Sequence, residues 1–149
     1  MKINLNLTES GHVGLNVTDL ERSERFYRNI FGFGVQLESS DHGGKYAFLT
    51  NGGRLILTLW EQSEGRFKKY RPGLHHLAFH VASWDDLRRS KKVLDRLGVH
   101  YRYDRTASEA DGFMWSGIFF EDPDGISLEI YSTRVNEAGS RIDNNACSS

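Results

Sequence analysis

The sequence predicts an α+β fold made of two tandem βαβββ modules, and three observations support this prediction. The segments at 11–35 and 75–101 repeat the same order of features, each with a histidine in its first two residues. Each segment places a short apolar strand directly before an amphipathic helix. A pattern typical of a β-hairpin then follows each helix. With four strands in each module, the 149 residues fit one domain with an internal repeat.

The first two elements of each module are a strand that ends at a valine and a helix that starts two or three residues later. Thr18 and Ser83 are each followed three residues later by an acid, which is the pattern of a capping box at a helix N-terminus. Apolar residues at helical spacing then fall on one side of each helix. Gly32 and Gly98 follow, where a left-handed C-cap is expected.

Three strands are expected after each helix. They lie around Leu37 and at 46–50 and 54–60 in the first module, and at 99–103, 115–121 and 126–131 in the second. The segments 51–53 (Asn-Gly-Gly) and 122–125 (Asp-Pro-Asp-Gly) supply the turns between the last two strands of each module. Each module therefore reads strand, helix and three strands.

The module boundaries follow from changes in composition. The segment 61–73 is polar and contains Pro72, which fits a linker, and from Ser132 onward the sequence is polar again, which predicts a loosely ordered tail. The assignment is one domain at 1–134, with modules at about 9–61 and 74–132, and a polar tail at 135–149.

Composition narrows the classes of function. Nineteen Lys and Arg against twenty Asp and Glu give a net charge of −1, which argues against a nucleic-acid partner. The longest apolar stretch, at 55–60, is far shorter than the roughly 20 residues that span a bilayer, and the N-terminus lacks the apolar core of a signal peptide. Cys147 is the only cysteine, so neither a disulfide framework nor a cysteine metal site is expected. We expect a soluble cytoplasmic protein without a membrane partner.

Two motifs in this repeat, GHVGLNVTDLERSERFY and FFEDPDGISLEIY, resemble the vicinal oxygen chelate superfamily. Its members include glyoxalase I, extradiol dioxygenases, methylmalonyl-CoA epimerase, fosfomycin-resistance thiol transferases and bleomycin-binding proteins. The resemblance covers about 11–131. It implies two curled mixed sheets that form a cup around a divalent metal ion, a small-molecule substrate and a possible homodimer.

Carried over residue by residue, the resemblance implies metal ligands at His12, His76 and Glu129. Two imidazoles and one carboxylate suit iron, manganese, nickel, cobalt or zinc, and leave positions open for substrate or water. The alternative is that the two histidines lie at strand edges and that Glu129 is solvated. Strand parity turns His75 away from His76, so His75 is the weaker candidate.

The first module departs from the family pattern at one position. Aligning Gly53 with Gly125 places Leu57 opposite Glu129, where glyoxalase I commonly supplies a fourth ligand. Neither Leu57 nor Thr58, which takes this position if the register slips by one residue, can donate a carboxylate. A site with four protein ligands is therefore not expected.

His80 and Glu61 are the candidate proton acceptors. His80 shares a strand face with His76, and could equally form hydrogen bonds in the lining of the cup. Glu61 shares a face with Leu57 but lies about 13 Å further along at ~3.3 Å per residue. The resulting prediction is a metal-dependent enzyme that acts on a small substrate with adjacent oxygens, as a lyase, isomerase, dioxygenase or thiol transferase. The alternative is a metal-free binding protein of the bleomycin-resistance type.

The extradiol dioxygenase pattern is matched only in part. Phe119 stands where that pattern has a tyrosine, and 110–112 lacks its histidine, so ring cleavage is not favoured.

Aromatic and basic side chains have two interpretations each. The aromatic residues either line an apolar pocket or, as favoured here, pack between sheet and helix. They are Phe48, Trp60, Phe113, Trp115, Phe119 and Tyr131. The basic run at 66–71 either receives an anionic group or, as favoured, forms a solvated linker face.

Overall fold

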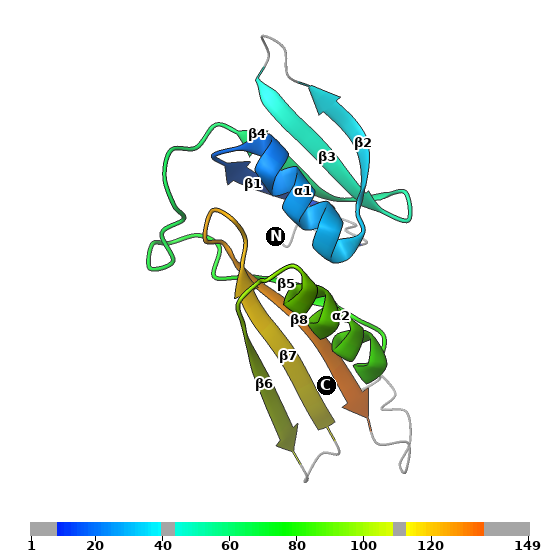
Figure 1. Cartoon of the computed structure of the whole chain (residues 1–149). Helices are drawn as coiled ribbons and strands as arrows, with labels where there is room; N and C mark the ends of the chain where they lie inside the picture. The colour runs from blue at the N-terminus through cyan, green and yellow to red at the C-terminus, as the bar shows by residue number, and fades with distance from the viewer. Residues whose placement is uncertain (1–8, 40–43, 109–112, 136–149) are drawn as a thin grey trace, which may run out of the picture. The chain divides into compact units, whose positions relative to one another are not determined.

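The computed structural model describes residues 9–39, 44–108 and 113–135 (Figure 1). Its elements are β1 (Val13–Val17), α1 (Leu20–Phe31), β2 (Gly34–Ser39), β3 (Lys45–Asn51), β4 (Arg54–Glu61), β5 (Leu77–His80), α2 (Trp84–Arg96), β6 (Tyr101–Ser108), β7 (Phe113–Glu121) and β8 (Ser127–Val135). The chain divides into two units, and each is described by itself. Unit 1 comprises Met1–His76 and Glu121–Ser127, and unit 2 comprises Leu77–Phe120 and Leu128–Ser149.

The predicted α+β fold of two βαβββ modules is confirmed by the topology of the two sheets. The strand order is β1-β4-β3-β2 in one sheet and β5-β8-β7-β6 in the other. The first strand of each module pairs in parallel with the last strand, β1 with β4 and β5 with β8. The two modules therefore have the same strand order as well as the same sequence of elements.

In unit 1, α1 packs against β3 and β4 and lies across one face of the sheet (Figure 1). Alternate residues of the strands are buried on that face because successive side chains of a strand point to opposite sides. This core comprises Leu15, Val17, Leu20, Tyr27, Ala47, Leu49, Leu57 and Leu59. The opposite face, which we call the open face of unit 1, carries Gly14, Asn16, Tyr46, Phe48, Thr58 and Trp60.

In unit 2, α2 lies across β5 and β8 (Figure 1). Its buried residues share a core with alternate residues of β7 and β8: Leu87, Leu94, Ile118, Phe120, Leu128 and Ile130. The intervening residues of the strands form the open face of unit 2. β8 continues to Val135 and Ser132 is fully buried, so the expectation of a loosely ordered tail is wrong for 132–135. Cys147 and the rest of the predicted tail lie outside the described residues.

The structure confirms the capping residue that the sequence predicts at three of the four helix ends. Ser83 caps α2 and accepts a hydrogen bond from the backbone N–H of Asp86. Gly32 and Gly98 have the left-handed φ values of 70° and 66° that a C-terminal glycine supplies. The N-cap of α1, however, is Asp19 and not Thr18. The Thr18 hydroxyl donates instead to Asp124 Oδ1 at 2.5 Å, which leaves the adjacent carboxylate to cap the helix.

Among the residues that the structure describes, no helix is long and apolar enough to cross a membrane.

Candidate functional site

Glu129 lies on the open face of unit 2, with only 6% of its surface exposed. Its chain neighbours Leu128 and Ile130 are buried in the core, so the carboxylate points away from α2. It reaches the space above Gly117 on β7, where a Cβ atom would lie 3.2 Å from Glu129 Oε1 and 2.5 Å from Cζ2 of Trp115. The glycine thus leaves room for an indole and a carboxylate side by side.

Other polar and aromatic side chains lie on the same open face. The Trp115 and Phe119 rings lie 5.8 Å apart between centroids, and the Arg102 guanidinium lies 4.7 Å above the Phe119 ring. His80 pairs across the ladder with Tyr131, with ring centroids 5.0 Å apart. The face therefore combines a carboxylate, an imidazole and a guanidinium with three aromatic rings.

The open face of unit 1 is aromatic as well. The rings of Tyr46, Phe48 and Trp60 lie 5.1 to 6.1 Å apart. The favoured prediction, that these aromatic residues pack between sheet and helix, is therefore wrong for Phe48 and Trp60. It is equally wrong for Trp115, Phe119 and Tyr131, which are half-buried on the face turned away from the helix. The side chain of Phe113 and the segment 109–112 lie outside the described residues.

The residue of unit 1 that corresponds to Glu129 is Thr58, not Leu57. Gly14 of β1 pairs with Thr58, as the equivalent Ala78 of β5 pairs with Glu129. The alignment through the two glycine turns fails because β4 contains a β-bulge. Thr50 pairs with Leu55 and Leu49 pairs with Leu57, so Ile56 is an extra residue that shifts the strand by one.

Thr58 is buried and its hydroxyl accepts a hydrogen bond of 3.1 Å from the Trp60 indole N–H. The open face of unit 1 therefore presents a neutral hydroxyl where unit 2 presents a carboxylate. Thr58 is the residue expected at this position if the register slips by one.

The two histidines predicted as ligands, His12 and His76, each lie directly before the first strand of a module and are exposed. His75 is not turned away from His76, because both residues precede β5 and strand parity does not apply to them. Their Nδ1 atoms lie 2.7 Å apart, so one ring donates a hydrogen bond to the other. His75 is thus placed as a direct partner of a predicted ligand.

Glu61, predicted as a proton acceptor, lies on the helix side of its sheet. Its Oε2 accepts a hydrogen bond of 2.8 Å from the backbone N–H of Leu20, and its Oε1 lies 2.8 Å from Lys45 Nζ. The hydrogen bond from Lys45, followed by that from Leu20, lowers the pKa of the Glu61 carboxyl. In this arrangement the side chain anchors the first turn of α1.

Within the described residues, no three His, Cys, Asp or Glu side chains form a group that could hold a metal ion. His12 and His76 belong to unit 1, whereas Glu129 belongs to unit 2. This ligand set stays a prediction.

A network that the sequence did not reveal holds the turn at 122–125 in unit 1. Asp122 accepts hydrogen bonds from the backbone N–H groups of Asp124 and Ile126 and, at 2.9 Å, from the hydroxyl of Tyr27 on α1. Asp124 accepts from the backbone N–H and hydroxyl of Thr18. The Arg22 guanidinium on α1 lies 2.6 Å from the same carboxylate.

The pKa values of the two carboxyl groups of this turn are shifted in opposite directions. Burial raises the pKa of Asp122 although three hydrogen bonds favour its charge. Burial also raises the pKa of Tyr27, and the nearby Asp122 charge raises it further. For Asp124, burial is outweighed by the hydrogen bonds from Thr18 and the charge of Arg22, so its pKa is lowered. A tyrosine on the buried side of an amphipathic helix is the signal that could have pointed to this network.

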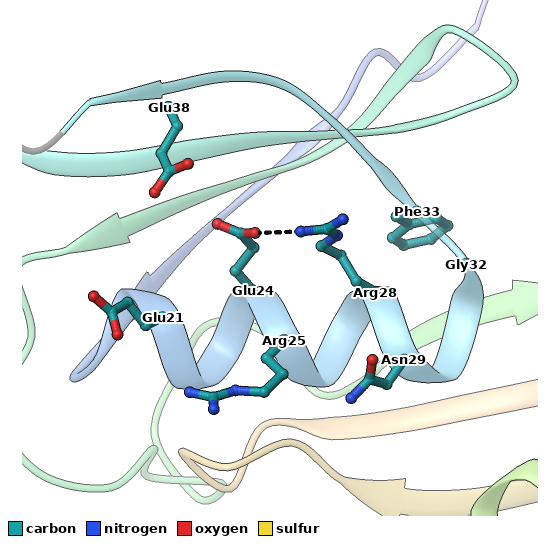
Figure 2. Close-up of a pocket in the computed structure, with 8 residues that line it drawn as sticks. All are labelled: Glu21, Glu24, Arg25, Arg28, Asn29, Gly32, Phe33 and Glu38. Carbon is teal, nitrogen blue, oxygen red and sulfur yellow. Dashed lines mark hydrogen bonds and ion pairs between the residues drawn. The ribbon is translucent and has the colours of Figure 1, made fainter.

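Two cavities lie in unit 1. One, of about 790 Å³, lies beside α1. Figure 2 shows Glu24 and Arg28 extending from α1 toward β2, where Glu38 lies, while Arg25 and Asn29 point to another side of the helix. Glu24 and Arg28 are paired at 3.0 Å. The charges of this groove offset one another, which does not favour a charged ligand.

The second cavity, of about 820 Å³, runs along β1 and is walled by the linker, including Arg66, Lys68 and Arg71. The basic run is exposed, as the favoured prediction states. Arg66 and Lys69 in addition form ion pairs with Glu121.

Comparisons with known proteins agree with this fold. The family model of the Glyoxalase/Bleomycin resistance protein/Dioxygenase superfamily matches residues 10–130. The chain is 28% identical over 138 residues to a probable trivalent organoarsenical cleaving enzyme of Bacillus subtilis (strain 168), covering 91% of this chain and 88% of that protein.

Two solved structures show the same architecture. A glyoxylase/bleomycin resistance protein/dioxygenase domain from Frankia sp. EAN1pec has a TM-score of 0.72 and 28% identity, covering 88% of this chain and 96% of that one. A mutant of the fosfomycin resistance protein FosX from Listeria monocytogenes, complexed with Mn(II) and 1S,2S-dihydroxypropylphosphonic acid, has a TM-score of 0.65 and 20% identity, covering 85% and 92%.

Proposed function

The chain belongs to the Glyoxalase/Bleomycin resistance protein/Dioxygenase superfamily, and from this premise we propose that it is a divalent-metal-dependent enzyme acting on a small substrate with adjacent oxygens. The observation that carries the proposal is the nearly buried carboxylate of Glu129 on the open face of unit 2, beside Trp115. Carboxylate oxygens are ligands that divalent first-row metal ions accept, so this side chain can contribute one ligand to a metal site.

The proposed ligands are His12, His76 and Glu129. Their donor set suits a divalent first-row metal, because imidazole nitrogen and carboxylate oxygen are the ligands that such ions accept. A bound ion would polarise two adjacent substrate oxygens and stabilise negative charge on them. Relatives include proteins whose names specify an organoarsenical substrate, and a structural neighbour was solved with Mn(II) and a diol.

The other residues of the open face have roles of their own in this proposal. His80 accepts a proton from the substrate, because it is exposed, lies on the same face as Glu129 and carries an imidazole, the group that most often transfers protons in enzymes. Trp115 and Phe119 provide apolar surface that excludes water from the reacting oxygens.

Two features favour a substrate that binds the metal ion through oxygen atoms, at coordination positions that the protein ligands leave open. Trivalent arsenic binds soft thiolates, and the 149 residues contain one cysteine. Thr58 at the position equivalent to Glu129 supplies no carboxylate, so three protein ligands would leave positions for both substrate oxygens. These features support chelation of a diol, a catechol or a hydroxy-carbonyl compound.

A metal-free binding protein is the second candidate. The observation that favours it is the group of Tyr46, Phe48 and Trp60 on the open face of unit 1, which offers a surface for an aromatic ligand without any charged group. Retention of His12, His76 and Glu129 favours the enzyme over this alternative.

The test is metal content and affinity. Gently purified protein and the variants His12→Ala, His76→Ala and Glu129→Gln are compared by elemental analysis and by calorimetric titration with Mn(II), Fe(II), Co(II), Ni(II) and Zn(II). We expect about one equivalent of metal, bound at least roughly 10-fold more weakly in each variant. His100→Ala, at an exposed histidine outside the proposed set, is the matched control and should bind as the parent does.

Folded variants that bind metal as tightly as the parent would overturn the ligand assignment. Absence of binding for all five ions, together with tight binding of aromatic ligands, would establish the binding-protein alternative instead.

A further inference from the structure

The second cavity of unit 1 follows the outer edge of β1. Its lining includes Leu15, which points into the core, and Asn16, which points to the open face of unit 1. Because side chains of both faces line it, the cavity lies along the edge of the strand and not on either face of the sheet. β1 is an outermost strand of its sheet, next to β4. An edge strand presents backbone N–H and C=O groups that can bond to a ligand.

The linker forms the opposite wall of this cavity and is held in place by the turn before β8. The backbone N–H of Phe67 donates a hydrogen bond of 2.8 Å to the carbonyl of Asp124. The Arg66 guanidinium lies against Gly125, where a Cβ atom would be 2.8 Å from Nη2, and pairs with Glu121 at 3.0 Å. These contacts give the cavity a fixed wall, and all the residues that line it belong to unit 1.

The charges that line the cavity do not balance. Arg66 and Asp124 are each engaged in an ion pair with a residue outside the lining. Lys68 and Arg71 also line the cavity, and within the part of the chain that the structure describes no ion pair joins either side chain to a carboxylate. Glu64 is the remaining carboxylate among the described lining residues. Two cations against one carboxylate leave an excess of one positive charge, which attracts an anion.

A turn of the linker brings the two cations together. The backbone N–H of Arg71 donates a hydrogen bond of 3.1 Å to the carbonyl of Lys68. The guanidinium offers a planar fork that matches the two oxygens of a carboxylate, and the ammonium adds a point charge. The excess of a single positive charge matches a carboxylate better than a doubly charged phosphate.

The rest of the lining suits the apolar part of a small molecule. Phe67 and Leu74 are half-buried and Ile126 is buried, and all three line the cavity. Its volume of about 820 Å³ falls within the range of roughly 300–1,000 Å³ that is usual for small-molecule sites, which combine apolar walls with a few polar groups.

We propose that this cavity is a binding site for a small organic monocarboxylate with an apolar body. Lys68 and Arg71 bind the carboxylate, and Phe67 and Leu74 contact the apolar body. The basic run of the linker thus receives an anionic group through the two of its cations that Glu121 does not engage. The site is independent of the proposed function, because none of the proposed metal ligands lines it.

A matched pair of probes tests the requirement for charge. The isotope-labelled full chain is titrated with 4-phenylbutyrate and with the neutral 4-phenylbutanamide, and the backbone amide signals are followed by NMR. A chelator is present throughout, so that no carboxylate binds through a metal ion. We expect saturable shifts at residues 13–16 and 63–74, and binding of the acid at least about 5-fold tighter than that of the amide.

Variants of exposed linker residues locate the effect. Arg71→Gln and Lys68→Gln should each weaken binding of the acid about 3-fold or more and leave binding of the amide nearly unchanged. Lys69→Gln is the matched control, because it removes the same charge from the same linker at a side chain that is paired with Glu121 and does not line the cavity. It should keep the full preference for the acid. The amide spectrum of each variant shows whether it is folded.

Several results would overturn the proposal. They are the absence of saturable shifts at millimolar probe, shifts confined to other parts of the chain, equal affinity for acid and amide, and a loss in Lys69→Gln as large as that in Arg71→Gln. Because every titration contains a chelator, these results do not depend on metal binding. Failure of the proposed function, which is measured by metal content and metal affinity, is therefore distinguished from failure of this inference.

Discussion

The hydroxyl of Tyr27 donates a hydrogen bond of 2.9 Å to Oδ2 of Asp122, which joins α1 to the turn that precedes β8. Tyr27 is fully buried and Asp122 is 4% exposed. The other oxygen of Asp122 accepts from the backbone N–H groups of Asp124 and Ile126, so the carboxylate holds the turn and the helix at once. Within unit 1, Asp122 therefore ties α1 to the turn at 122–125.

Replacing Tyr27 by phenylalanine should destabilise the protein by about 1–3 kcal/mol, because it leaves a buried carboxylate oxygen without its donor. Urea unfolding followed by circular dichroism measures the change. Tyr101→Phe is the matched control, since Tyr101 donates a hydrogen bond of 2.8 Å to Asp95 at an exposed site. It should change the unfolding midpoint little. Equal effects of the two substitutions would show that the buried bond has no special weight.

Asp124 should make the protein sensitive to acid. Its pKa lies below its ordinary value of 3.8, because the hydrogen bonds from Thr18 and the charge of Arg22 outweigh burial. Its stabilising contribution is therefore present above pH 3.8 and is lost as the pH falls through the lower pKa of the folded state. Asp124→Asn should lower the urea midpoint at pH 7, and its difference from the parent should shrink below pH 3.8.

Asp122, in the same turn, should contribute to stability with the opposite dependence on pH. Burial raises its pKa, so its contribution to stability is present below 3.8 and is lost as the pH rises through the folded value. If the urea midpoints of the parent and of Asp124→Asn differ by the same amount at every pH, the loss of stability in acid does not come from Asp124.

The variant Glu61→Gln should distinguish a structural role of Glu61 at the N-terminus of α1 from a role as proton acceptor. Because Glu61 binds the N-terminus of α1 and Lys45, with a pKa lowered by the Lys45 and Leu20 hydrogen bonds, the variant should unfold at a lower temperature at pH 7. The loss should vanish as the pH falls below 4.5 through the folded pKa. Glu64→Gln in the linker should unfold as the parent does. Unchanged unfolding combined with loss of turnover would establish Glu61 as the proton acceptor instead.

The helices and strands could be predicted from short stretches of sequence, because the residues that begin and end them lie within a few positions of one another. Ser83 followed by Asp86 indicates a cap, and Gly52 with Gly53 supplies the two positive φ values, 57° and 82°, of a tight hairpin turn. Thr18 and Asp19 show the limit of such reasoning. Either can cap a helix, and the choice depends on Asp124, 106 residues away from Thr18.

The types of residue in the candidate site could be predicted from the sequence, whereas the pairing of residues between neighbouring strands could be predicted less well. Glu129 on the last strand was evident from the motif that contains it. The equivalence of Thr58 with Glu129 was not, because the bulge at Ile56 is set by pairing with Leu49 and Thr50 across the strands. The stacking of Arg102 on Phe119 likewise depends on the ladder between β6 and β7, which the sequence does not specify by itself.

Gly117→Ala should weaken metal binding by displacing the side chains beside it. The new methyl group would lie 2.5 Å from the Trp115 ring and 3.2 Å from Glu129 Oε1, so the indole must move and the carboxylate loses its neighbour. We expect Mn(II) affinity to fall about 10-fold, by the same argument that gives losses of this size when groups supporting a metal ligand are removed. Gly14→Ala, where the nearest atom is Thr58 Oγ1 at 3.3 Å, should leave the affinity unchanged.

A second substitution identifies the cause of that loss. In the double variant Gly117→Ala with Trp115→Leu, the smaller side chain removes the collision. If the indole transmits the effect to Glu129, the double variant should bind Mn(II) more tightly than Gly117→Ala alone, with a coupling energy that a double-mutant cycle measures. Additive losses would instead place the effect on the backbone of β7, and Trp115 would have no part in positioning the carboxylate.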